Sequence, residues 1–158
     1  MLKIISHNLQ ETNFIGKIIG KNTEKGTVIC LDGDLGAGKT TLTQSIAKGI
    51  EIDEYITSPT FNIIKEYDGR LKLFHMDVYR INDIIEMIDL GYEEYIYSDG
   101  VCIIEWSDKI KEILPENRIN MRLLRGKEEN ERTFHIDGKG SSFEKIEKEL
   151  MKYDSTSN

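Results

Sequence analysis

The residues with the clearest chemistry form one glycine-rich segment that matches the phosphate-loop pattern G-x-x-x-x-G-K-[ST] at every defined position. Glycine lets backbone N–H groups approach a phosphate closely, and the N-terminus of a following helix adds partial positive charge. Lys39 can reach the β- and γ-phosphates, and the Thr40 hydroxyl can ligate Mg²⁺. The segment predicts a nucleoside triphosphate site formed by Gly33, Asp34, Leu35, Gly36, Ala37, Gly38, Lys39, Thr40 and Thr41.

A carboxylate suited to the metal ion follows the apolar run Val101-Cys102-Ile103-Ile104. Glu105 ends this run, which is the Walker B arrangement with Glu in place of the commoner Asp. In an open α/β sheet, a strand end holds such a carboxylate beside the phosphate loop. The sequence therefore predicts Thr40 and Glu105 as the Mg²⁺ ligands. A carboxylate that merely ends a strand is the alternative.

The sequence indicates less clearly which base the nucleotide carries and which molecule accepts the phosphoryl group. The chain has no N-K-x-D motif for guanine, which favours ATP by exclusion. Arg125 and Arg132 flank an acidic loop, which we interpret as a solvated turn. The sequence places no arginine clearly within reach of the γ-phosphate. Arg80 is the best candidate within the chain for that role. A small-molecule kinase and a nucleotide-dependent binding switch without turnover remain alternatives.

The elements that position these residues alternate along the chain. A strand over 28–31 precedes the loop, and a helix over 39–49 follows it. Asn8, with Glu11 three residues on, is expected to begin a first helix, and Asn82 is expected to cap a helix that runs through Leu90. Two strands are expected on either side of a two-residue hairpin turn at Asp68-Gly69, and two more around the turn 125–130. Ser141 with Glu144 predicts the start of a last helix. This order predicts a single α/β P-loop domain over residues 1–153, three-layered, with a mixed central sheet flanked by helices and a disordered tail at 154–158.

Composition excludes several classes of protein. A formal charge of −7 repels phosphate backbones, so we expect no binding to DNA and no general binding to nucleic acid. The longest apolar runs have four residues, far short of the roughly 20 that span a membrane. The N-terminus lacks the apolar stretch of a signal peptide, which predicts a cytoplasmic protein. Cys30 and Cys102 lie in apolar runs and are expected to be buried, reduced thiols.

Four segments occur together in an order and spacing that resemble a known family: residues 33–41, Ser58-Pro59-Thr60-Phe61, His75-Met76-Asp77-Val78-Tyr79-Arg80 and Ile104-Glu105-Trp106. The chain resembles the bacterial TsaE (YjeE-type) ATPases, which take part in forming threonylcarbamoyladenosine at position 37 of tRNA. The resemblance extends from the first expected helix to at least Leu124. It implies a P-loop domain that binds ATP and Mg²⁺.

The resemblance also implies a partner, the TsaB–TsaD heterodimer, through which tRNA is reached indirectly. TsaD transfers the threonylcarbamoyl group, and ATP hydrolysis supports turnover of the complex. Hydrolysis by the isolated chain is expected to be weak and stimulated by the partner.

Several site residues follow from the resemblance by position. Lys39 and Glu105 are implied as catalytic residues, Thr12 lies near the nucleotide, and Thr60 falls in a loop that senses the γ-phosphate. Asp77 ends a strand with buried neighbours, so its carboxylate is predicted to face the site as a third catalytic group. Pairing of Asp77 with Arg80, or capping of the next turn, is the alternative. Neighbouring His75 is interpreted as a packed core imidazole.

Overall fold

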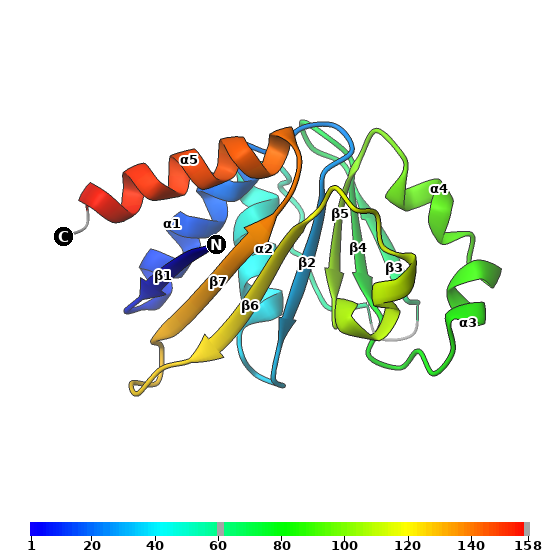
Figure 1. The fold of residues 1–158 in the computed structure, drawn as a ribbon, viewed down its shortest axis with the longest axis horizontal. Helices are drawn as coiled ribbons and strands as arrows, with labels where there is room; N and C mark the ends of the chain where they lie inside the picture. Colours follow the sequence, from blue (N-terminus) through cyan, green and yellow to red (C-terminus); the bar gives the residue numbers. More distant parts are fainter. Residues whose placement is uncertain (60–61, 157–158) are drawn as a thin grey trace.

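The computed structural model describes residues 1–59 and 62–156, with the backbone alone at 155 and 156. Its described strands form one seven-stranded sheet in the order β1-β7-β6-β2-β5-β4-β3 (Figure 1). The strands are β1 (Leu2–Ser6), β2 (Val28–Gly33), β3 (Ile64–Tyr67), β4 (Leu73–Asp77), β5 (Val101–Glu105), β6 (Ile119–Arg125) and β7 (Arg132–Gly138). The helices are α1 (Leu9–Lys21), α2 (Lys39–Gly49), α3 (Ile84–Asp89), α4 (Tyr92–Ile96), the 3₁₀ segment η1 (Ser107–Ile113) and α5 (Ser141–Thr156).

The centre of the sheet is parallel, and this determines where a site can form. β2 pairs in parallel with both β6 and β5, and β5 pairs in parallel with β4. Their carboxyl ends therefore meet at one edge, the lower edge in Figure 1. β7, β1 and β3 are antiparallel to their neighbours, so the sheet is mixed, as predicted. Ligands of open α/β sheets bind at this carboxyl edge.

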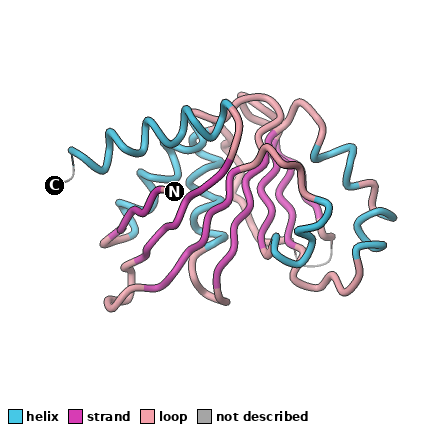
Figure 2. The backbone as a smooth tube through the Cα atoms, in the orientation of Figure 1, coloured by secondary structure: helices cyan, strands magenta, loops and turns pink. Residues whose placement is uncertain are grey.

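Helices cover both faces of the sheet, which confirms the predicted three layers (Figure 2). On one face, α1, α2 and α5 bury Ile15, Leu42 and Ile146 against the strands. On the other face, α3, α4 and η1 pack Met87, Tyr92, Ile96 and Ile110 over β4, β5 and part of β2. The central strand β2 is buried on both sides, which explains its continuous apolar run.

Local capping agrees with the sequence at one helix and differs at another. The Asn8 side chain accepts a hydrogen bond from the Glu11 N–H at 2.8 Å and begins α1, as expected. At α3 the capping residue is Asp83, which forms a reciprocal capping box with Glu86. Asn82, the residue expected there, lies one position earlier. Its N–H donates to the Glu86 carboxylate at 2.9 Å.

The β3–β4 hairpin forms around Asp68-Gly69, but its loop is longer than two residues. Tyr67 pairs with Leu73, so five residues connect the strands. The Arg70 N–H donates to the Ile50 carbonyl at 2.7 Å, and a Cβ on Gly69 would lie only 2.6 Å from that oxygen. The wider loop therefore lets the hairpin dock against the end of α2.

The structure adds a strand near the N-terminus and extends the predicted last helix near the C-terminus. β1 pairs with β7 at the edge of the sheet and has no counterpart in the sequence analysis. α5 continues through Thr156, so residues 154–156, expected in the tail, belong to its last turn.

Two expectations on composition, those on the cysteines and on membrane-spanning segments, can be compared with the described residues. Both thiols are buried, and burial raises the pKa of Cys30 and Cys102 to about 12. Over the described ranges, every helix is too short or too polar to cross a membrane.

Candidate functional site

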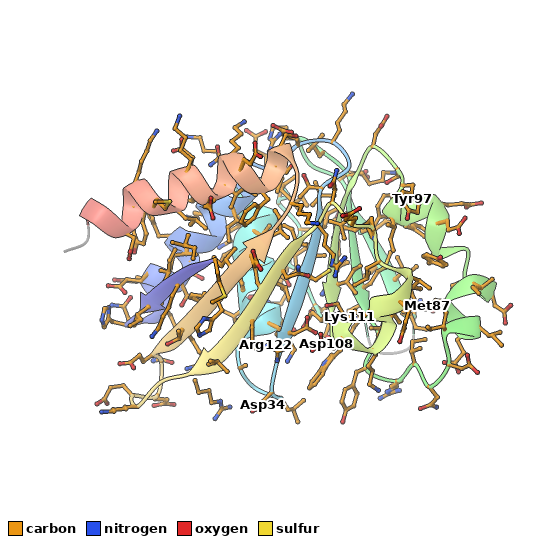
Figure 3. All side chains as sticks on the ribbon, in the orientation of Figure 1. Asp34, Met87, Tyr97, Asp108, Lys111 and Arg122 are labelled. Carbon is orange, nitrogen blue, oxygen red and sulfur yellow. The ribbon has the colours of Figure 1, made fainter. Side chains whose placement is uncertain are left out.

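The predicted phosphate loop connects the carboxyl end of β2 to the first turn of α2. Gly36 and Gly38 have φ angles of 78° and 103°, in the left-handed region that favours glycine. The loop lies at the carboxyl edge of the sheet, and Figure 3 labels Asp34 at this edge. Strand, loop and helix follow in the order that a phosphate-binding loop requires.

Lys39 folds back over this loop. Its Nζ donates to the carbonyls of Gly33 at 2.6 Å and Asp34 at 2.9 Å, and the residue is only 6% exposed. The ammonium also lies 4.0 Å from the centre of the Trp106 ring. Burial lowers the pKa of Lys39, and the nearby carboxylates, Glu105 first among them, oppose this shift. These contacts hold the Lys39 ammonium against the phosphate loop.

Glu105 lies where the sequence predicts it, beside Thr40. The Thr40 hydroxyl is 3.3 Å from Oε1 and 3.5 Å from Oε2 of Glu105, which is 2% exposed. The parallel register aligns Glu105 with Leu31, two residues before the loop begins, and this alignment brings the two side chains together. A hydroxyl and a carboxylate are hard oxygen donors of the kind that Mg²⁺ prefers.

The donor set fits a metal ion that is completed by its substrate. Among the described residues, no cluster of three or more His, Cys, Asp or Glu side chains could hold a metal. Mg²⁺ is usually held by one or two carboxylates together with phosphates and water. Thr40 and Glu105 therefore fit a nucleotide-bound Mg²⁺ better than an all-protein metal site.

His75 on β4 is buried, as expected, but it also contacts the site. Its Nε2 lies 2.5 Å from Oε2 of Glu105, and the residue is 0% exposed. Its Nδ1 is buried and has no hydrogen-bond partner in the described part of the chain. A proton on Nδ1 would find no acceptor, so the network places the proton on Nε2, which donates to Glu105. His75 thereby leaves Oε1 of Glu105 for Thr40 and a metal.

Asp77 ends β4 directly beside Glu105 in the sheet register. Its carboxylate accepts hydrogen bonds from the Ser58 hydroxyl at 3.1 Å and from the Tyr79 N–H at 3.0 Å. It also borders a cavity of about 320 Å³ that Arg80 helps to line. The carboxylate therefore caps the turn after β4 and lies at the edge of this cavity, while its strand position is paired with Glu105.

The predicted threonines have different surroundings. The Thr12 hydroxyl is buried and lies 2.7 Å from the Ser6 hydroxyl, where β1 joins α1. Thr41 lies in the first turn of α2, next to Thr40. Thr60, predicted in a loop that senses the γ-phosphate, falls outside the described residues.

The turn between β6 and β7 is solvated, as the sequence predicts, but the two arginines that flank it also reach the phosphate loop. Arg125 donates to the Gly36 carbonyl at 2.9 Å through Nη2 and at 3.2 Å through Nε, and Arg132 Nε donates to the Ala37 carbonyl at 2.8 Å. β6 is the parallel neighbour of β2, so its carboxyl end lies beside the phosphate loop. Arg125 follows Met121 and Leu123 at a spacing of two, so all three side chains lie on the same face of β6. This spacing is the sequence signal that places Arg125 on the face of the phosphate loop.

Comparisons with known proteins agree with one another. A family model described as "Threonylcarbamoyl adenosine biosynthesis protein TsaE" matches residues 6–134. The TsaE protein of Bacillus subtilis is 45% identical over 99% of this chain and 98% of its own length. The TsaE protein of Treponema pallidum is 41% identical over 77% of this chain and 90% of its own length. A crystal structure of Bacillus subtilis YdiB superposes with a TM-score of 0.78, at 39% identity over 97% of this chain and 95% of that one.

The buried contact between His75 and Glu105 leads to a stability prediction. His75→Leu removes the donor and leaves a buried carboxylate short of a partner, so the free energy of unfolding should fall by about 1–3 kcal/mol. His75→Gln retains an N–H donor and should lose less. Urea unfolding at neutral pH measures both values.

The matched control is His7, which also contacts a glutamate, Glu11 at 3.0 Å, but has a side chain 67% exposed. His7→Leu should change stability little because exposed pairs contribute little. Equal losses for His75→Leu and His7→Leu, or for the Leu and Gln variants at position 75, would contradict this account.

Proposed function

Because the chain belongs to the TsaE family, we propose that it is a Mg²⁺-dependent ATPase that serves the biosynthesis of threonylcarbamoyladenosine in tRNA. The observation that carries this proposal is the meeting of Lys39, Thr40 and Glu105 at the carboxyl edge of the sheet. These three groups supply the cation, the hydroxyl and the carboxylate that a P-loop ATPase uses.

Nucleotide binding is assigned to the loop and the start of α2. The N–H groups of the loop, with the N-terminus of α2, receive the phosphates. Lys39 exchanges its hydrogen bonds to the loop carbonyls for bonds to phosphate oxygens. Thr41 adds a hydroxyl, and Thr12 and Thr60 remain predicted nucleotide contacts on the strength of the family resemblance.

Thr40 and Glu105 would hold the metal. When bound, Mg²⁺ neutralises charge on the phosphate oxygens. His75 keeps one oxygen of Glu105 occupied and so orients the other toward Thr40. Such outer contacts commonly set the geometry of a metal-binding carboxylate.

Hydrolysis would then depend on positioning and electrostatics, because little covalent chemistry is left to the protein in phosphoryl transfer. Lys39 stabilises charge on the transferred phosphoryl group. We assign Glu105 and Asp77 as the carboxylates of the catalytic centre, since they end neighbouring strands in register and Asp77 borders a cavity.

The proposed partner is the TsaB–TsaD heterodimer, which would bring the tRNA. A net charge of −7 is poorly suited to holding tRNA without such a partner. The proposed tRNA role fits a cytoplasmic location.

Lys39→Ala tests the nucleotide site. Loss of the ammonium should abolish measurable ATP binding while the fold persists, because the phosphates lose their only lysine from the loop. Equilibrium dialysis with ATP and Mg²⁺ measures binding. The fluorescence of Trp106, the single tryptophan, gives a second measurement beside Lys39.

Lys48→Ala is the matched control, since Lys48 is an exposed lysine in the last turn of the same helix. It should bind ATP as the wild type does. ATP binding by Lys39→Ala at the wild-type level would overturn the assignment of this loop as the phosphate site.

The proposed function also predicts the rate of ATP hydrolysis. P-loop enzymes without an arginine finger turn over on the order of 10⁻⁴ to 10⁻³ per second, and a finger supplied by a partner adds about 10³–10⁵-fold. The isolated chain should release phosphate slowly with no added acceptor, and TsaB–TsaD with tRNA should accelerate it. Steady-state phosphate release measures each condition. Full-rate hydrolysis that the heterodimer leaves unaltered, or release only with an added small-molecule acceptor, would count against the proposal.

A further inference from the structure

We propose that Arg125 and Arg132 are positioning residues that hold the phosphate loop from outside in its binding conformation. This inference rests on the proposed function of the loop as a nucleotide site. The two arginines donate to consecutive loop carbonyls, Gly36 and Ala37, at 2.8–3.2 Å. They lie directly opposite each other in the β6–β7 register and so reach the loop side by side.

The planarity of the peptide bond makes these contacts relevant to phosphate binding. The carbonyl of one residue and the N–H of the next share one rigid plane and point in opposite directions. Fixing the Ala37 carbonyl therefore fixes the Gly38 N–H, and fixing the Gly36 carbonyl fixes the Ala37 N–H. The Ala37 N–H donates to the Asp34 carbonyl at 3.0 Å, within the turn of the loop. The arginines thus orient two N–H groups of the loop: that of Ala37, which closes the turn of the loop, and that of Gly38, which the proposed function assigns to the phosphates.

A loop of this composition needs such support. Glycine loses more conformational freedom on ordering than any other residue, and this loop contains three glycines within six residues. Gly36 also provides the space for its own support, since a Cβ there would lie 2.4 Å from Nη2 of Arg125. Glycine at position 36 therefore permits both the positive φ angle of the loop and the close approach of the Arg125 guanidinium.

Arg132 connects the loop to a structured element. Its Nη1 donates to the carbonyls of Glu129 at 2.7 Å and Glu131 at 2.9 Å, while its Nε holds Ala37. The planar guanidinium presents these donors in a fixed geometry. The phosphate loop is thereby tied to the β6–β7 hairpin, and two positive charges lie beside a site for anions in a chain of net charge −7.

The test compares nucleotide affinity in paired variants of the full chain. Isothermal titration calorimetry with ADP and with ATP, both in Mg²⁺, is applied to Arg125→Ala/Arg132→Ala and to Arg125→Lys/Arg132→Lys. The double alanine variant should bind with a dissociation constant about tenfold higher. The lysine variant should recover this loss only in part, because an ammonium keeps the charge but lacks the guanidinium fork.

Arg122→Ala is the matched control. Arg122 lies on β6 but on the opposite face from Arg125, and its Nη2 donates to the exposed carboxylate of Asp108 at 2.8 Å. Both residues are labelled in Figure 3. Its removal should leave the affinity unchanged. If the double alanine variant is unstable, Arg132→Ala alone is measured, and it should still show a several-fold loss at a temperature where it is folded.

The outcomes separate this inference from the proposed function. If the wild type binds nucleotide, Lys39→Ala does not, and the arginine variants match the wild type, the positioning role alone is overturned. Full recovery by the lysine variant would assign the effect to charge and would also overturn it. If the wild type binds no nucleotide, the proposed function and this inference fall together.

Discussion

The structure depends on one buried carboxylate and the strand pairing that places it. The parallel register of β2 and β5 sets Glu105 opposite Leu31 and beside Thr40, where the residue is 2% exposed. Burying a carboxylate is costly unless hydrogen bonds compensate. His75 from β4 and Thr40 from α2 supply them. The same contacts therefore bind β4, β5 and α2 into one arrangement and create a pair of oxygen donors at the edge of the sheet.

The phosphate loop is held from two sides. Inside, the Lys39 ammonium bonds to the carbonyls of Gly33 and Asp34. Outside, two arginines of the β6–β7 hairpin bond to the next carbonyls along the loop, Gly36 and Ala37. A loop ordered before its ligand arrives spends less binding energy on ordering when the ligand binds. The proposed nucleotide site is therefore largely formed by the fold itself.

Much of the site could be predicted because its signals are local. The phosphate loop is a contiguous pattern, and Glu105 directly follows an apolar run. The contacts of His75 and the two arginines could not be predicted, because they join residues 30, 89 and 95 positions apart and depend on the order of strands in the sheet. The five-residue hairpin loop likewise depends on docking against α2, which no local turn preference encodes.

The most direct test of the central claim is a double-mutant cycle on Thr40 and Glu105. The ATP dissociation constant is measured with Mg²⁺ and with a chelator for Thr40→Val, Glu105→Gln and the double variant. If both side chains serve one metal ion, each single variant removes most of the Mg²⁺-dependent affinity and the double variant loses little more. Independent, additive losses, or an affinity that Mg²⁺ raises equally in all variants, would contradict the account.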